Sequence, residues 1–254
     1  MEATVYEQFA ELERDHFWFV GRRRIFFDQL DRVLAGSQRL EILEVGCGAG
    51  GMLGPLAKYG SVTGLDISKE YIQFCKSRGH QKVLTGSGYE LPFRDASFDL
   101  VAAFDTIEHI PDDALVLREF QRVLRPGGRL FVSVPAYQFL YSQNDRVAHH
   151  QRRYTRKMLG ERLHAAGFTS TKTSYFNTML FPLILPAVLV LKLKEKLFGL
   201  PDGQTNLSHR FAGPVNSIFA WIMSSERWLL RNMDFPFGHS LFSVSKAVAD
   251  PATR

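Results

Sequence analysis

One stretch, residues 40–51, constrains the fold of this 254-residue chain more than any other. Its apolar run of Ile42, Leu43 and Val45 is typical of a buried parallel strand. Four glycines follow within six positions, at 46, 48, 50 and 51. Glycine permits positive φ and lets another molecule approach the backbone closely. A strand that ends in such a loop and leads into a helix lies at the carboxyl edge of an α/β sheet, where such sheets bind ligands.

The remaining chain alternates between strand and helix signals, which predicts βαβ units and a mostly parallel sheet. Further strands are expected at 61–65, 82–84, 98–104, 129–134, 169–175 and 238–246, and helices at 4–34, 52–59, 68–79, 112–124 and 155–166. In the helix at 112–124, Leu115 is expected to face inward with its apolar neighbours. The predicted division is an N-terminal helical cap (1–37), a core (38–176), an apolar helical insertion (177–236), and a last strand with a tail (237–254).

Composition sets broad limits on location and partners. The net charge of +5 is concentrated at 22–24, 152–157 and 192–196. Clustered cations can bind nucleic acid, a membrane surface or an anionic substrate, but more often they only face solvent. Cys47 and Cys75 indicate neither a disulfide framework nor a metal cluster, so a reducing cytoplasm is expected. The first residues show no basic and apolar regions of a secretory signal.

The glycine loop alone leaves three interpretations open. Gly46-x-Gly48-x-x-Gly51 fits the dinucleotide-binding fingerprint, and it also fits a tight strand-to-helix turn without a ligand. With Glu44 two residues ahead, Gly46-x-Gly48-x-Gly50 resembles motif I of class I S-adenosylmethionine (SAM) methyltransferases. Asp66, at the end of the second expected strand, is placed to accept hydrogen bonds from both ribose hydroxyls.

The segment after residue 90 makes the resemblance specific. Leu91-Pro-Phe-x-Asp-x-Ser-Phe-Asp-x-Val101, Asp105-Thr-Ile-Glu-His109 and Leu124-Arg-Pro-Gly-Gly128 follow in order. Together with the glycine loop, this series resembles the UbiE/Methyltransferase-11-like branch of class I SAM methyltransferases over about residues 40–135. The resemblance implies a Rossmann-like, seven-stranded, mostly parallel sheet with helices on both faces and an antiparallel last strand. It also implies SAM as cofactor.

The resemblance assigns the cofactor contacts to the ends of successive strands. Relatives usually carry an acidic residue where this chain has Ser87, whose hydroxyl can still accept a hydrogen bond from the adenine amino group. The implied SAM-binding residues are Glu44, Gly46, Cys47, Gly48, Gly50, Asp66, Ile67, Ser87, Gly88 and Phe104.

The N-terminal flank resembles a segment that closes over SAM in related enzymes. There a basic residue binds the methionine carboxylate, which implies one of Arg22, Arg23 and Arg24, with Arg23 or Arg24 preferred. Trp18 is a candidate to cover the sulfonium, since aromatic faces attract cations. Alternatively, the aromatic residues 17–19 only pack this helix on the sheet.

The loop after the fifth strand leads toward the methyl acceptor. A histidine suits proton removal at neutral pH, so His150 is the first candidate for a general base, with His109 and Asp105 as second choices. Alternatively, His150 only hydrogen-bonds the backbone of the loop, and Arg152 and Arg153 pair with surface carboxylates. No metal is predicted, and the candidate acceptor contacts are Arg152, Arg153, Tyr154 and Tyr137.

The insertion is apolar over 179–191 and then carries Lys192, Lys194 and Lys196. Two prolines and a short uncharged run argue against a transmembrane helix. The segment could be a lid over a hydrophobic acceptor, a membrane-surface contact, a dimer contact or plain core. We therefore expect a cytoplasmic SAM-dependent methyltransferase of a small or lipid-like acceptor, with peripheral contact to the inner membrane face as an option. The alternatives are an RNA methyltransferase and a non-catalytic scaffold at a membrane, although 134–137 lack the motif of many base N-methyltransferases.

Overall fold

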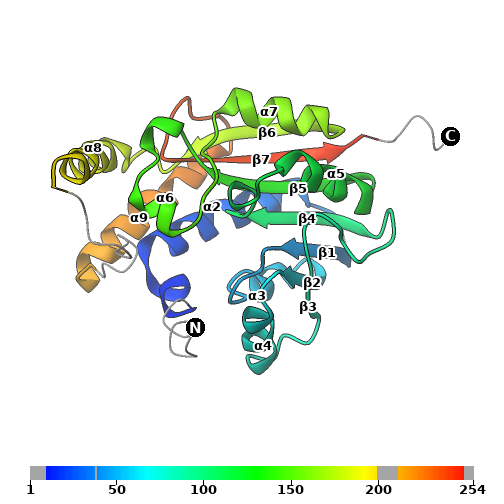
Figure 1. Cartoon of the computed structure of the whole chain (residues 1–254). Coiled ribbons are helices and arrows are strands. Elements are labelled where there is room, and N and C mark those ends of the chain that lie inside the picture. Colours follow the sequence, from blue (N-terminus) through cyan, green and yellow to red (C-terminus); the bar gives the residue numbers. More distant parts are fainter. Residues whose placement is uncertain (1–9, 38, 199–210, 249–254) are drawn as a thin grey trace.

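The computed structural model describes residues 10–37, 39–198 and 211–248, and these form a seven-stranded sheet of order β3-β2-β1-β4-β5-β7-β6 (Figure 1). Neighbours from β3 to β5 pair in parallel, and β7 pairs antiparallel with both β5 and β6. The predicted fold, including the antiparallel last strand, is confirmed. The strands are β1 (Leu40–Val45), β2 (Gly60–Asp66), β3 (Val83–Thr85), β4 (Phe98–Phe104), β5 (Leu124–Pro135), β6 (Phe168–Phe176) and β7 (Ser240–Ala247).

Helices cover both faces of this sheet. Figure 1 shows α5 in front of the central strands and α2 behind them. The α-helices are α2 (Phe17–Val33), α3 (Leu53–Leu56), α4 (Lys69–Ser77), α5 (Asp113–Val123), α6 (Gln143–Val147), α7 (Arg156–Ala165), α8 (Phe181–Phe198) and α9 (Gly213–Leu230), with short 3-10 turns η1 (Ile107–His109) and η2 (Gln138–Leu140).

The aromatic residues of α2 build the core on one face of the sheet. The Phe26 ring lies 5.5 Å from Phe104, 5.1 Å from Phe131 and 5.2 Å from Phe176, measured between ring centroids. These three partners belong to β4, β5 and β6, so one side chain of α2 contacts three strands. Offset and edge-on aromatic pairs add about 0.5–1.5 kcal/mol each beyond the burial of their area, which fixes α2 firmly on the sheet.

Three local predictions were wrong. The helix expected at 52–59 is reduced to the single turn α3, and turns follow it. Strand β5 begins at Leu124, directly after α5, and runs through Gly127, whose φ of +80° bends it. Leu115 is 43% exposed, because the buried stripe of α5 runs through Val116, Leu117 and Phe120 instead.

Between β6 and β7 the chain forms α8 and α9, and buried polar contacts fix them to the core. Glu226 of α9 is fully buried and accepts hydrogen bonds from the backbone N–H groups of Asn177 and Met179, both at 2.7 Å. Burial raises the pKa of Glu226 to about 7. Among the helices in the described ranges, none is long and apolar enough to cross a bilayer.

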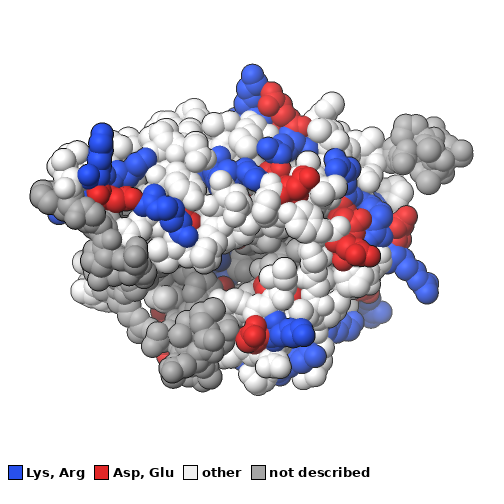
Figure 2. All heavy atoms as spheres, in the orientation of Figure 1, with Lys and Arg blue, Asp and Glu red and all other residues white. Residues whose placement is uncertain are grey.

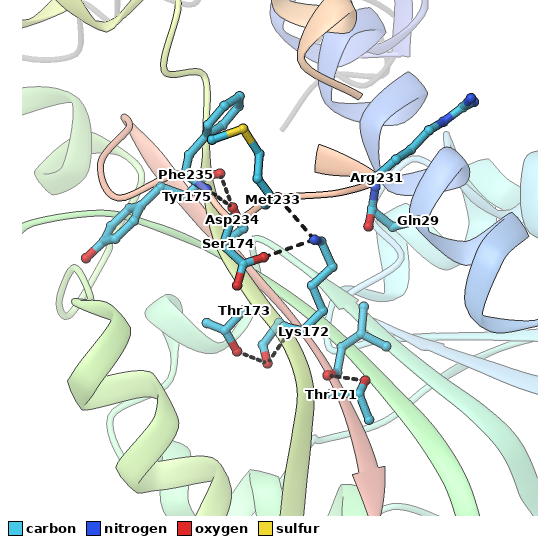
Figure 3. A network of polar contacts seen from close by, with 12 residues as sticks. Gln29, Thr171, Lys172, Thr173, Ser174, Tyr175, Arg231, Met233, Asp234 and Phe235 are labelled. Atoms are coloured by element: carbon cyan, nitrogen blue, oxygen red, sulfur yellow. Dashed lines mark hydrogen bonds and ion pairs between the residues drawn. The ribbon is translucent and has the colours of Figure 1, made fainter. Parts of the chain in front are cut away.

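The end of α9 is fixed to the edge strand β6 by a polar network (Figure 3). The Lys172 ammonium donates to Asp234 Oδ1 at 2.9 Å, and the Phe235 N–H donates to Ser174 Oγ at 2.8 Å. A depression beside this network is lined by Arg156, Lys172 and Asp234 at the β6 edge, away from the glycine loop at β1. These hydrogen bonds join the segment after α9 to β6, so we assign the network a structural role.

Helix α9 also packs along α2. A Cβ atom added at Gly21 would lie 2.6 Å from Met223 Sδ, so the two helices approach closely there. Asn216 of α9 accepts a hydrogen bond from the Phe17 N–H at 2.8 Å and donates to the Asp15 carbonyl at 2.9 Å. The N-terminal segment and the region between β6 and β7 therefore form one connected layer.

Candidate functional site

The glycine loop after β1 is organised by Asp66 at the end of β2. The Gly48 N–H donates to Asp66 Oδ2 and the Ser68 N–H donates to Asp66 Oδ1, both at 2.9 Å. Gly46 and Gly48 have φ of +73° and +50°, and a Cβ at Gly46 would lie 2.5 Å from Thr106. Each carboxylate oxygen has about two lone-pair sites, so both oxygens of Asp66 can still accept a ligand hydroxyl.

The other residues assigned to the cofactor lie at the ends of β1 to β4. Ile67, directly after Asp66, is 79% exposed, which is unusual for a large apolar side chain and leaves a surface that a flat ring could cover. Figure 2 shows the surface hollowed near the carboxyl end of β1. Cys47 and Gly50 lie buried in the glycine loop, Ser87 and Gly88 are half-buried after β3, and Phe104 ends β4 in the core.

Glu44 and Arg22 supply unpaired polar atoms at this edge. Glu44 Oε2 and Arg22 Nε are buried and lack a hydrogen-bond partner within the described part of the chain. Burial, and then the charge of Glu13, raise the pKa of Glu44 well above its usual value. A Cβ atom at Gly51 would lie 2.6 Å from Glu13 Oε2, so the N-terminal segment reaches the glycine loop.

Of the three consecutive arginines, the structure brings Arg22 to the site. Its guanidinium is buried, pairs with Asp105 after β4, and lies 4.6 Å from the centre of the Phe19 ring. Arg23 instead donates to the Glu13 carbonyl at 3.0 Å, and Arg24 is exposed and reaches Ser224 of α9 at 3.4 Å. This geometry favours Arg22 over Arg23 and Arg24 as the basic residue at this edge of the sheet.

Trp18 packs on the sheet rather than over the glycine loop. Its ring stacks on Phe176 of β6 at 5.8 Å, and its face meets the edge of His239 at the same distance. Burial lowers the pKa of His239 to about 3, so His239 is an uncharged neighbour. These contacts favour the packing interpretation of the aromatic residues 17–19.

On the acceptor side, Asp145 of α6 orients His150. Asp145 Oδ1 lies 2.8 Å from His150 Nδ1 and 2.8 Å from Arg153 Nε, and the carboxylate is 1% exposed. Burial alone would raise the pKa of Asp145, but the hydrogen bonds from His150 and Arg153 hold it below its usual range. An ionised Asp145 keeps the proton on Nδ1, which leaves His150 Nε2 as a lone-pair donor for another group.

His109 and Glu108 of η1 lie directly beside His150. The His109 and His150 rings meet edge to face, with centroids 4.6 Å apart. Loss of solvent around the ring, followed by the charge of His150, lowers the pKa of His109 to about 4. The Gln151 N–H donates to the Glu108 carbonyl at 2.7 Å, which holds the His150 loop against η1.

The other candidate acceptor contacts form the frame of this loop. Tyr154 is fully buried and donates to Asp113 Oδ2 at 2.6 Å, while Arg152 donates to the Ile110 carbonyl at 2.9 Å. Arg153 is 7% exposed, and its guanidinium donates to Asp145 Oδ1. This placement favours a structural role for all three, and only half-buried Tyr137, stacked on Tyr175 at 5.1 Å, stays at the surface of the site.

Comparison with known proteins finds methyltransferases among the similar sequences and structures. A family model described as "Methyltransferase domain" matches residues 43–132, which run from β1 to β5 through the glycine loop and Asp66. Residues 43–132 thus match a methyltransferase domain. This match agrees with the resemblance to SAM-dependent methyltransferases in the sequence.

Two curated proteins are similar to this chain in sequence. The chain is 33% identical over 163 residues to a "Probable S-adenosylmethionine-dependent methyltransferase" of Mycolicibacterium smegmatis, covering 62% of this chain and 61% of that protein. It is 32% identical over 170 residues to 27-O-demethylrifamycin SV methyltransferase of Amycolatopsis mediterranei, covering 56% and 62%. It therefore spans about three fifths of the length of these relatives.

A solved structure shares the fold. It is a methyltransferase in complex with the Haloferax volcanii Trm112 methyltransferase activator, with a TM-score of 0.60 and 18% identity over 95% of this chain and 93% of that one. Within this fold, the residues of the site fit SAM. Glu44 Oε2 and Arg22 Nε, two of the buried atoms without a partner among the described residues, suit an ammonium and a carboxylate, and Asp66 suits ribose hydroxyls.

Proposed function

We propose that this protein transfers a methyl group from SAM to a small-molecule acceptor. The observation that carries the proposal is the position of Asp66, whose carboxylate fixes the Gly48 N–H and keeps lone pairs free at the carboxyl ends of β1 and β2. Parallel α/β sheets bind ligands at this edge. The buried Arg22 and Glu44 supply an unpaired donor and an unpaired acceptor for the two ends of a zwitterion.

The acceptor is proposed to lie against His150 and His109. Methyl transfer from a sulfonium is an in-line displacement, so the protein mainly has to align the nucleophile with the methyl carbon. Asp145 orients His150 with Nε2 directed away from the carboxylate, which is the arrangement of a positioned general base. The nucleophilic atom would bond to the methyl carbon and give its proton to His150 Nε2. The carbon–sulfur bond would break, and the electron pair of that bond would stay on sulfur.

Two measurements test the proposal together. Calorimetry is expected to show one SAM bound per chain, and a screen of hydrophobic acceptors with mass detection is expected to show the gain of one methyl group. The buried donors and acceptors around Asp66 are the reason to expect saturable binding. No binding at millimolar SAM would overturn the proposal and favour a non-catalytic scaffold.

We also propose that the methyl acceptor is hydrophobic. Helix α8 lies beside the acceptor loop, because Lys192 donates to the Phe139 carbonyl in η2 at 2.7 Å and Glu195 pairs with Arg146 of α6. Leu183, Leu193 and Leu197 of α8 are 63%, 56% and 63% exposed. Exposed apolar residues beside lysines are typical of a segment that lies on an anionic membrane surface, from which a lipid-like acceptor could be reached.

This membrane contact predicts a specific loss of vesicle binding. The double variant Leu193→Glu/Leu197→Glu is expected to abolish co-sedimentation with anionic phosphatidylglycerol vesicles, because it places two carboxylates on the apolar surface beside Lys194. Leu115→Glu is the matched control, since Leu115 is a similarly exposed leucine on α5. Equal binding by the wild type and both variants would show that α8 does not contact lipid.

A further inference from the structure

We propose that Glu108, His109 and His150 bind a divalent transition-metal ion on the acceptor side of the site. Each of the three offers one ligand atom, and these atoms lie within 4.8 Å of one another. Two imidazoles and one carboxylate are a common ligand set for Zn²⁺ and Fe²⁺, and they also suit Mn²⁺. The sequence alone predicts no metal, because the three residues come from two separate segments that only the fold brings together.

Glu108 is the first reason to expect a cation. Its side chain is fully buried, and neither carboxylate oxygen has a hydrogen-bond partner among the residues that the structure describes. Burying a carboxylate without a partner is costly, and the cost falls when a cation is coordinated. Both oxygens of this buried side chain are therefore available to a cation bound between Glu108, His109 and His150.

The second reason is the way in which His150 is held. Metal-binding histidines almost always donate their other ring N–H to a carboxylate or carbonyl, which fixes the tautomer and the ring orientation. Asp145 Oδ1 takes this position at 2.8 Å from His150 Nδ1. This leaves the Nε2 lone pair of His150 available to an ion.

Backbone contacts hold the two segments in register. The Gln151 N–H donates to the Glu108 carbonyl at 2.7 Å, the His150 N–H donates to the Asp145 carbonyl at 2.8 Å, and the Tyr141 hydroxyl donates to the His150 carbonyl at 2.8 Å. Ligand atoms around a tetrahedral zinc ion lie about 3.4 Å apart. His109 is exposed, so rotation of its side chain can supply the remaining approach.

A metal ion at this site would also indicate the chemical class of the methyl acceptor. This inference rests on the proposed function. Three protein ligands leave at least one open position, as in catalytic zinc sites. A hydroxyl oxygen of the acceptor bound there loses its proton to solvent more readily, because the cation stabilises the resulting oxyanion. That oxygen attacks the methyl carbon of SAM, the carbon–sulfur bond breaks, and the electron pair leaves on sulfur. The inferred acceptor is therefore an alcohol or a phenol.

The test is calorimetry on the full chain without an affinity tag, after removal of metal by a chelator. Titration with ZnCl₂ and MnCl₂ is expected to show one ion per chain. Glu108→Gln, His109→Ala and His150→Ala are each expected to weaken binding by more than tenfold, and Asp145→Asn by about 10–100-fold, as for other residues that orient a metal ligand. Glu161→Gln and His164→Ala, which are exposed residues of α7, are matched controls expected to bind as the wild type does.

The His109→Ala variant and the spectrum of bound Co²⁺ test the metal site separately from folding and activity. His109 is exposed, so His109→Ala should fold even if Glu108→Gln does not, and unchanged affinity in His109→Ala would overturn the site. The visible spectrum of the Co²⁺-loaded wild type reports nitrogen and oxygen ligation independently of activity. Saturable SAM binding without metal binding would refute the metal site and leave the proposed function standing, whereas metal binding without SAM binding would do the reverse.

Discussion

Replacing His150 with alanine is expected to lower the rate of methyl transfer by about two to four orders of magnitude, the usual contribution of a positioned acid–base group. Affinity for SAM should stay unchanged, because His150 belongs to the loop after α6 and the cofactor contacts lie at β1 and β2. Nε2 cannot accept a proton and coordinate an ion at the same time. Without an ion the loss of rate reflects the missing proton acceptor, and with an ion it reflects the weakened metal site. Turnover is measured with an acceptor found by the mass screen, and SAM affinity by calorimetry.

The matched control for this prediction is His164→Ala, which removes an exposed histidine from α7. It should retain both turnover and SAM affinity. A structural role for His150 would show itself differently. Loss of its hydrogen bond leaves the buried Asp145 with Arg153 and Ser142 as partners. A general loosening of the loop would lower turnover and SAM binding together. An equal loss of both would contradict the assignment of His150 to the acceptor.

Asp66→Ala is expected to weaken SAM binding by an order of magnitude or more. The variant removes the charge-assisted hydrogen bonds to the ribose, which are about twice as strong as neutral ones. It also frees the N–H groups of Gly48 and Ser68, so the glycine loop loses the contact that holds it in its binding conformation. Calorimetry with SAM and with S-adenosylhomocysteine measures both effects, since the two ligands share the ribose.

Two comparison variants sharpen this experiment. Asp66→Asn keeps one oxygen acceptor but not the charge, so its affinity should fall between those of the wild type and Asp66→Ala. Asp95→Ala removes a carboxylate whose side chain is 78% exposed and paired with Arg122, and it should bind SAM normally. Unchanged affinity in Asp66→Ala would refute the ribose contact and, with it, the orientation proposed for the cofactor.

The strands of the core are the part of the fold that local pattern predicts best. The ranges 40–45 and 98–104 agree with β1 and β4 to the residue, because both strands are buried on two faces and read as nearly continuous apolar runs. Weaker patterns fail for identifiable reasons. Leu115 is as apolar as its neighbours, but the docking angle of α5 places Val116 and Leu117 on the sheet instead. The early start of β5 depends on pairing of Leu124 with Phe98, a contact that no local pattern contains.

The site was less predictable because side-chain direction decides it. Successive residues of a helix point about 100° apart, so only one of Arg22, Arg23 and Arg24 can face the sheet, and the packing of α2 selects Arg22. Glu108 was visible only as part of a motif, since its burial depends on the loop that folds over η1. Asp145 was missed as the residue that orients His150, although an acid shortly before a histidine in the acceptor loop was a usable signal.

The close packing of Gly21 against Met223 has a consequence for how α2 can move. Helix α2 carries Arg22 to the methionyl end of the site, while α9 leads through Glu226 to the start of α8 beside the acceptor loop. Since Asn216 also holds the backbone at Asp15 and Phe17, α2 cannot tilt outward without taking α9 with it. Any opening of the N-terminal helix is therefore expected to move α9 as well.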